Sequence, residues 1–287
     1  MAQTRTVQRR IRSVRNAKQI TKALEVVAAS RMRKVVQLVE GSRTYGELAS
    51  SIMRSISPNP EAKQSAFFLP AADKPTLYVI FTSDRGQAGA FNSNIFNLAL
   101  SMFREERHRA QVVVFGRKGA RFFSRLDQID LLGTYENIED NPDMNVFAPV
   151  IEMIEDGAEN GEIGRVVIIN TEFISSLTQK ANAFQFLPIE AGEEEVKQST
   201  DKVYEFEPET VDVLEEAIRL YAAAKLMQAR IESAASEHAM RMVAMGNANR
   251  NASDLIDTLT LELNATRQAA ITQEIAEITG GAAAIAA

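Results

Sequence analysis

The residues best placed to do chemistry are those of Thr82–Asn92, a loop with the sequence TSDRGQAGAFN. The loop follows a buried-strand pattern at Thr76–Thr82 and precedes an amphipathic helix pattern at Ile95–Arg107. Phosphate-binding loops occupy this place, because backbone N–H groups at the start of a helix attract anions. However, the loop lacks the Lys-Ser/Thr pair of a Walker motif and the spacing GxGxxG. A structural turn is therefore the favoured interpretation, and a nucleotide-binding enzyme that uses Asp84–Asn92 is the alternative.

A second candidate for binding chemistry is Gly116–Gly119 (GRKG), which has the GxxG spacing of loops that clamp a nucleic-acid backbone. Four residues carry little information by themselves, so a turn is again the favoured interpretation. The chain contains only two histidines. We expect His108 to lie on the surface at a helix end, and His238 to be packed within a helix rich in Ala and Met.

No combination of nucleophile, base and orienting group can be recognised in the sequence. The absence of cysteine excludes disulfides, thiolate metal sites and a cysteine nucleophile. Acidic pairs such as Glu139 and Asp140 are typical of solvated loops. We therefore expect no active site within this chain, no cofactor and no metal site.

Charge is distributed unevenly along the chain. The net charge is −6, yet residues 1–46 carry eleven Lys and Arg against only Glu25 and Glu40. This basic segment could be a nucleic-acid arm, a transit peptide, a solvated helix face, or a rod that meets an acidic partner. Helical patterning runs past residue 50 without a break that would suit cleavage, which argues against the transit peptide. A nucleic-acid-binding coiled-coil protein remains the alternative, and it predicts DNA affinity that falls steeply with salt.

The positions of proline and of the aromatic residues define the organisation of the chain. All eight prolines, and every aromatic residue except Tyr45 and Tyr221, lie between residues 58 and 208. The remaining ends have the composition of long helices, which we expect from about Thr4 to Ser57 and from Glu209 to Thr279. Gly280 and Gly281 should end the second helix. The predicted organisation is an N-terminal coiled-coil helix at 1–57, a central α/β domain at 75–190, a linker at 191–208 and a C-terminal coiled-coil helix at 209–287.

Both terminal segments carry seams of apolar or small residues at steps of three and four, which is typical of coiled coils. The first seam is Ile20, Leu24, Val27, Val35, Leu38, Ser42, Tyr45, Ala49, Ile52 and Ile56. The second is Met242, Met245, Asn249, Ala252, Ile256, Leu259, Leu263, Thr266, Ala270 and Gln273. Helices that enter and leave one domain should pair antiparallel, and the longer second helix should overhang the first by roughly 17 residues, about 25 Å. Something outside the chain would then cover Leu259, Leu261, Leu263 and Ile271.

The middle of the chain alternates strand and helix patterns. Strands are expected at Thr76–Thr82, Gln111–Phe115, Arg165–Thr171 and Ala183–Pro188, with helices between them at Ile95–Arg107, Gly119–Arg125 and Met144–Gly157. This alternation predicts a small, largely parallel sheet in a Rossmann-like α/β domain. No apolar run approaches the 18 residues that a membrane span requires.

Three motifs resemble those of one known family. Arg12–Arg33 (RSVRNAKQITKALEVVAASRMR) closely resembles the first helix of the F-type ATP synthase gamma subunit. Met240–Met245 (MRMVAM) and Leu263–Ile278 (LNATRQAAITQEIAEI) are similar to its C-terminal helix, and Thr82–Asn92 is similar to its Asp-Arg-Gly loop. The motifs occur in the family's order and span essentially the whole chain.

The resemblance implies a rotor rather than an enzyme. The coiled coil would stand inside a ring of three alpha and three beta subunits, with the α/β domain below, on the epsilon subunit and the membrane c-ring. Rotation would couple ion translocation to ATP synthesis or hydrolysis. The chain would be peripheral, on the cytoplasmic face of a bacterial plasma membrane, without a span of its own and without nucleic acid.

The resemblance also implies which residues make contacts. Those expected against a beta subunit are Arg267, Gln268, Thr272, Glu274, Glu237 and Arg241. The basic face expected to meet acidic beta loops consists of Lys18, Lys22, Arg31 and Arg33. The foot expected to meet the membrane ring and epsilon contains Tyr204 and Glu207.

Overall fold

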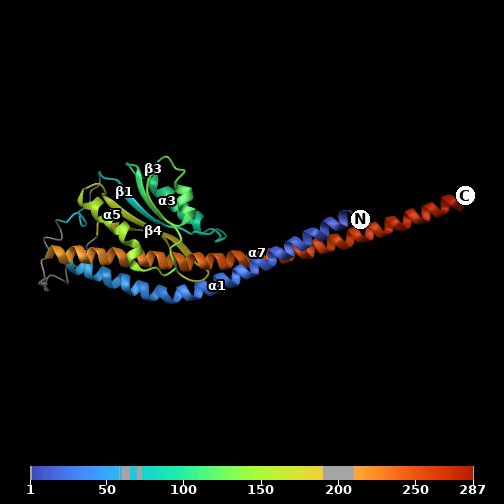
Figure 1. The fold of residues 1–287 in the computed structure, drawn as a ribbon, viewed down its shortest axis with the longest axis horizontal. Helices are drawn as coiled ribbons and strands as arrows, with labels where there is room; N and C mark the ends of the chain where they lie inside the picture. Colours follow the sequence, from blue (N-terminus) through green and yellow to red (C-terminus); the bar gives the residue numbers. More distant parts are fainter. Residues whose placement is uncertain (1, 58, 60–64, 70–72, 190–209, 287) are drawn as a thin grey trace. The chain divides into compact units, whose positions relative to one another are not determined.

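The computed structural model of the 287-residue chain describes residues 2–57, 59, 65–69, 73–189 and 210–286. Its elements, in chain order, are α1 (Ala2–Ile56), β1 (Thr76–Phe81), α3 (Phe91–Phe103), β2 (Ala110–Phe115), α4 (Arg117–Phe123), β3 (Ile129–Tyr135), the 3-10 helix η1 (Met144–Phe147), α5 (Ala148–Glu159), β4 (Arg165–Phe173), β5 (Gln179–Leu187) and α7 (Thr210–Ala286) (Figure 1). They form two compact units, one within residues 1–28 and 242–287 and the other within residues 29–241. The predicted fold class, long terminal helices with a central α/β domain, is confirmed.

The second unit is built on a five-stranded sheet in the order β3-β2-β1-β4-β5. The first four strands are parallel, and β5 is antiparallel to β4. Strand β1 lies at the centre, and each of its residues is buried, which explains its uninterrupted apolar sequence. The predicted largely parallel sheet is therefore confirmed, whereas β3 was missed, because its IDLLGTY sequence includes a glycine and lacks a continuous apolar run.

Alternate residues of each strand enter two separate cores. Tyr78 and Ile80 of β1 face a core formed with α3 and α4. Leu77 and Val79 face the other core, to which α5, α7 and the end of α1 contribute. The sheet is thus covered on both faces, as parallel sheets require.

Helix α7 passes through the second unit as a buried element. Every residue from 229 to 239 is buried, because α1, the sheet and the loop after β3 surround this part of the helix. Val35 and Val39 of α1 pack there against Ile231 and Ala235. The stretch combines four alanines and Ile231 with buried polar residues, and most of these polar side chains find hydrogen-bond partners on the surrounding elements, as burial requires.

The face by which α1 packs differs from the predicted seam. Val35, Ala49 and Ile56 are buried as expected, but the inward positions between them are held by Val39, Gly46 and Met53. The predicted seam residues Ile20, Val27, Leu38, Tyr45 and Ile52 are instead exposed, by 36–60%. Both rows run in steps of three and four residues, and where they differ the observed residue follows the predicted one directly, about 100° further around the helix. Spacing alone could not distinguish them.

In the first unit the two helices run antiparallel. Asn249 Nδ2 of α7 donates to the carbonyl oxygen of Lys18, and Val7 and Ile11 of α1 pack with Leu259. The predicted α7 seam is largely confirmed, with Met245 and Leu259 buried, although its last member, Gln273, is exposed.

The predicted overhang of α7 is present and longer than expected. With Asn249 opposite Lys18, the start of α1 comes opposite residue ~265 of α7, which leaves roughly 20 residues, about 30 Å, without an α1 partner. The expected stop at Gly280 and Gly281 was wrong, because α7 continues to Ala286. Each glycine costs only about 1 kcal/mol in a helix, and the following alanines are the best helix formers.

Two of the residues expected to need an outside partner are covered within the chain. Leu259 is 7% exposed and Leu263 packs against the same cluster, because α1 extends far enough to meet both. Leu261 and Ile271 are exposed, as expected, by 72% and 46%. Among the described residues, no helix is both long enough and apolar enough to cross a membrane.

Candidate functional site

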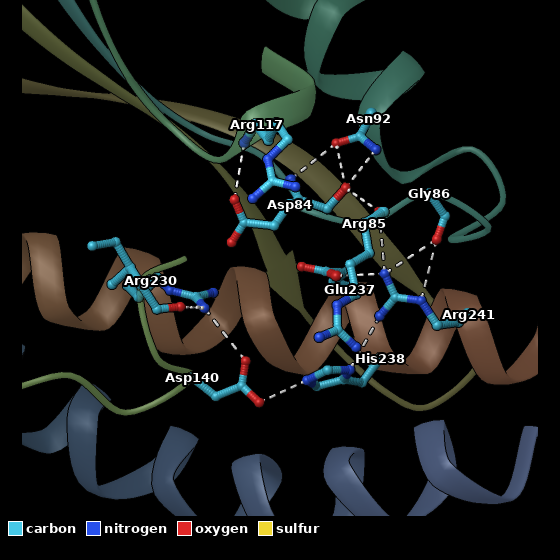
Figure 2. A network of polar contacts seen from close by, with 12 residues as sticks. Asp84, Arg85, Gly86, Asn92, Arg117, Asp140, Arg230, Glu237, His238 and Arg241 are labelled. Carbon is cyan, nitrogen blue, oxygen red and sulfur yellow. Dashed lines mark hydrogen bonds and ion pairs between the residues drawn. The ribbon is translucent and has the colours of Figure 1, made fainter. Parts of the chain in front are cut away.

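A network of polar contacts joins the loop after β1 to the ends of β2 and β3 (Figure 2). One carboxylate oxygen of Asp84 accepts from the backbone N–H of Arg117, and the other accepts from that of Asn137, both at 3.0 Å. Because Arg117 begins α4 and Asn137 follows β3, Asp84 ties the loop after β1 to the start of α4 and to the loop after β3. This contact favours the structural interpretation of Thr82–Asn92.

The neighbouring residues of this loop are also held by internal bonds. Thr82 Oγ1 donates to Phe115 O at 2.9 Å and accepts from Gly119 N at 3.0 Å. Gly116 has a φ of +105°, and a Cβ placed there would lie 2.3 Å from the carbonyl oxygen of Thr82. Gly116 is thus explained by its positive φ and a close backbone approach, while a Cβ at Gly119 would lie 2.6 Å from side-chain atoms of Thr82 and Val114.

Helix α7 contributes Glu237, His238 and Arg241 to the same network (Figure 2). Arg241 Nη2 lies 2.5 Å from Glu237 Oε1, and it also donates to the carbonyl oxygens of Arg85 and Gly86 at 3.3 and 3.4 Å. Both side chains of the ion pair are only 12% exposed. The resemblance assigns Glu237 and Arg241 to a beta contact, and the structure adds that they fasten the loop after β1 to α7.

Asp140 brings the loop after β3 onto α7. Its carboxylate lies 2.8 Å from His238 Nε2 and 3.3 Å from Arg230 Nη2, while Arg230 also donates to Ile138 O at 2.8 Å. Burial is the largest influence on the pKa of Asp140 and raises it, but the hydrogen bond from His238 and the charges of His238, Arg230 and Arg31 together hold that pKa below its ordinary value. Asp140 is therefore not the solvated loop charge that the sequence indicated. Arg230, the partner of Asp140, was not predicted, because neither residue belongs to a motif with a recognisable spacing.

The four contact residues expected near the end of α7 all lie in its overhanging part. Arg267, Gln268, Thr272 and Glu274 are exposed, and none forms a side-chain hydrogen bond or ion pair within the described part of the chain. Ile271, Ile275 and Ile278 lie among them and are 46–72% exposed. We call this stretch, residues 267–278, the α7 tip surface.

The residues of the expected basic face fall in both units. Lys18 is half-buried, and Lys22 pairs with Glu25 at 3.2 Å. Arg31 and Arg33 are exposed in the second unit, where Arg33 Nε donates to Ala29 O of its own helix. The expected foot residues, Tyr204 and Glu207, lie outside the described residues.

The remaining expectations concern histidine and metal. His108 is exposed after α3 and His238 is packed, as predicted. Within the described ranges, no group of three or more His, Asp or Glu side chains could hold a metal ion.

The fold and these surfaces define a class of protein, a two-helix coiled coil into which an α/β domain is inserted between the helices. A family model described as ATP synthase matches residues 3–285. Proteins described as ATP synthase gamma chain are 37% identical in Stenotrophomonas maltophilia and 35% identical in Desulfitobacterium hafniense, each alignment covering 99% of this chain and 100% of the relative. The chain therefore belongs to the ATP synthase gamma chain family.

Solved structures agree with this assignment. The central stalk of the Tetrahymena thermophila mitochondrial ATP synthase matches with a TM-score of 0.64 at 26% identity, covering 80% of this chain and 99% of that chain. A chain of the Euglena gracilis mitochondrial ATP synthase in rotational state 3 has the same fold, with a TM-score of 0.71 at 20% identity, covering 99% of this chain and 95% of that one. Nothing in these comparisons supports the nucleic-acid-binding alternative.

Proposed function

We propose that this chain is the central-stalk rotor subunit of an F-type ATP synthase. In this role it transmits torque between an ion-driven ring in the membrane and a catalytic hexamer of alpha and beta subunits. Its family membership and the likeness to a central stalk at 26% identity support the proposal. Rotation of the chain would couple ion translocation to ATP synthesis or hydrolysis, with the catalytic sites on the other subunits.

The observation that carries the proposal is the α7 tip surface. It combines exposed isoleucines with Arg267, Gln268, Thr272 and Glu274, whose side chains form no hydrogen bond or ion pair within the described part of the chain. This stretch of α7 lies beyond the start of α1. A single helix with exposed apolar residues is not stable in water by itself, since helices gain most of their stability from packing. A ring of surrounding subunits would supply that packing and still let the helix turn.

Polar contacts at the tip would distinguish angular positions of the rotor. We assign to the beta contact Arg267, Gln268, Thr272 and Glu274 at the tip, and Glu237 and Arg241 further back on α7. Hydrogen bonds to charged groups contribute about 1.5–3 kcal/mol each. Contacts of this size are strong enough to favour one orientation and weak enough to break during rotation.

The remaining assignments follow the same arrangement. Three alpha and three beta subunits would surround the helices, with Lys18, Lys22, Arg31 and Arg33 opposite acidic beta loops. The α/β domain, residues 75–190, and a foot within 191–208 that contains Tyr204 and Glu207 would meet epsilon and the membrane c-ring. Segments 1–57 and 209–287 would form the shaft. The complex would hold the chain at the cytoplasmic face of a bacterial plasma membrane.

The test is co-purification followed by rotation. Tagged beta subunit should retain alpha and this chain, and the complex should rotate a probe fixed to this chain when ATP is added. Arg267→Ala combined with Gln268→Ala should weaken assembly or reduce torque. The matched control is Asp257→Ala with Thr258→Ala, an adjacent exposed pair in the stretch of α7 that has an α1 partner. Intact assembly and rotation in the Arg267 and Gln268 variant would remove the role proposed for that pair.

A further inference from the structure

A groove lies between α5 and the first part of α7, two helices that Figure 1 shows side by side. Its volume is about 230 Å³, and we call it the α5–α7 groove. Ile151 of α5 is buried at its floor, whereas Leu220 of α7 is 38% exposed. The full apolar lining consists of Met144, Ala148, Ile151, Leu220 and Ala223. The groove thus offers an apolar surface that the rest of the described chain leaves uncovered.

The charged side chains that line the groove carry an excess of negative charge. Glu155 is 12% exposed at its side chain, and both of its carboxylate oxygens accept from Arg219 Nε, at 3.0 and 3.1 Å. Glu152 of α5 and Glu216 of α7 are exposed, and neither forms a hydrogen bond or an ion pair with the residues that the structure describes. Three carboxylates therefore share one guanidinium group, which leaves two negative charges on the rim.

The pKa of Arg219 shows that these carboxylates lie near one another. Its hydrogen bond to Glu155 is the largest influence and raises the pKa, and the charges of Glu216 and Glu152 raise it further. Carboxylates from both helices thus act on the same place. A positive group between the two free carboxylates would be attracted by both and would relieve their mutual repulsion.

We propose that the α5–α7 groove docks a basic segment of a partner protein. The segment lays an apolar side chain on the floor and places a lysine or arginine between Glu152 and Glu216. Complementary charge selects this occupant, because the rim is acidic on both sides of an apolar floor. The inference adds to the proposed function, which names no contact residue in α5, and it does not depend on assembly with alpha and beta subunits.

Other occupants suit the groove less well. Sites for small molecules usually have about 300–1,000 Å³, more than this groove provides. Within the described ranges, no group of three or more acidic or histidine side chains could hold a metal ion. The sequence that joins β5 to α7, residues 190–209, has eight acids against two lysines, so its charge is repelled by the rim.

The experiment measures binding of two synthetic peptides to the isolated full-length chain at low salt. One is a short amphipathic helix of Leu, Ala and Lys, and the other has Gln in place of every Lys. Because the chain contains no cysteine, Asn145→Cys supplies a single thiol at the groove for a fluorophore. The lysine peptide should change its fluorescence and bind about ten-fold more tightly than the glutamine peptide, the factor that two exposed ion pairs supply. The same fluorophore on Ser124→Cys, at the end of α4, should not respond.

Substitutions at the rim and on the floor identify the groups that bind. Glu152→Gln with Glu216→Gln should weaken binding of the lysine peptide about ten-fold, to the level of the glutamine peptide. The matched control is Glu105→Gln with Glu139→Gln, which removes two exposed charges outside the groove and should change the affinity less than about two-fold. Leu220→Gln keeps every charge and should weaken both peptides about three-fold, because it removes apolar contact.

Three results would each overturn the proposal. The fluorophore on Asn145→Cys could fail to respond to the lysine peptide, the rim pair could weaken binding no more than the control pair, or Leu220→Gln could leave both affinities unchanged. Self-association of the native chain that the rim pair abolishes would assign the groove to a second copy, and it would equally overturn the proposal. None of these results bears on co-purification with alpha and beta subunits, which tests the proposed function separately.

Discussion

Replacement of Arg43 by methionine tests how the second unit holds α1, α7 and the sheet together. Arg43 of α1 donates from Nε to Glu232 of α7 at 2.9 Å and from Nη2 to Phe173 O of β4 at 2.8 Å. Glu232 is 5% exposed at its side chain and has one further donor, Gln228, at 3.1 Å. Arg43→Met keeps the apolar stem but leaves a buried carboxylate without its countercharge.

The expected loss follows from the burial of the two partners. Removal of one member of a fully buried ion pair costs about 3–5 kcal/mol. Arg43 is 37% exposed, so water can partly replace it, and we expect a loss of about 2–3 kcal/mol in the free energy of unfolding. The additional variant Glu232→Leu should recover much of that loss, because it removes the unpaired charge.

Urea denaturation of the full-length chain, followed by circular dichroism, measures these values. The matched control is Lys34→Met, an exposed basic residue on the same helix, which should change stability by less than about 0.5 kcal/mol. The reasoning is refuted if Arg43→Met costs no more than Lys34→Met. It is equally refuted if adding Glu232→Leu to Arg43→Met makes the chain less stable still, since the buried charge would then not be the cause.

Two further predictions concern the network around the loop after β1. Gly116→Ala should cost about 3 kcal/mol or more in the free energy of unfolding, because its φ of +105° and the 2.3 Å approach to Thr82 O leave no room for a Cβ; a loss below about 1 kcal/mol in the same urea titration would contradict this. Asp140→Asn should lower stability at neutral pH. The pKa of Asp140 is depressed in the folded chain, so its contribution is present above the unfolded pKa of about 4 and is lost as pH falls through the folded value. The difference between native and variant chains should therefore shrink under acid conditions, and a difference that grew there would reverse the assigned sign.

The elements of the chain were largely predictable because they depend on local sequence. Proline-free, alanine-rich ends produced helices α1 and α7 close to the expected bounds, and apolar runs produced β1, β2 and β4. Strand β3 was missed because it borders the sheet and its exposure alternates, so it lacks the continuous apolar run of a central strand. The stop at Gly280 was misjudged because a glycine lowers helix stability without forbidding the helix.

The polar network could be predicted only in part. His238 was expected to be packed, and Glu237 and Arg241 were indicated by the resemblance. Asp140 lies 98 residues from His238 in the chain, and no spacing could relate the two. Its role depends on how the loop after β3 folds back onto α7, which is a property of the tertiary structure.

The sequence by itself therefore determined the architecture, two long helices around an α/β domain, and the motifs by which the chain resembles its family. Helical periodicity, strand hydrophobicity and the positions of proline act over a few residues and can be read directly. Only the tertiary structure decided which of two equivalent rows of α1 packs inward, how far α7 extends without an α1 partner, and that Asp84 ties the loop after β1 to the start of α4 and to the loop after β3. These features depend on groups far apart in the sequence, whose contacts exist only once the chain has folded.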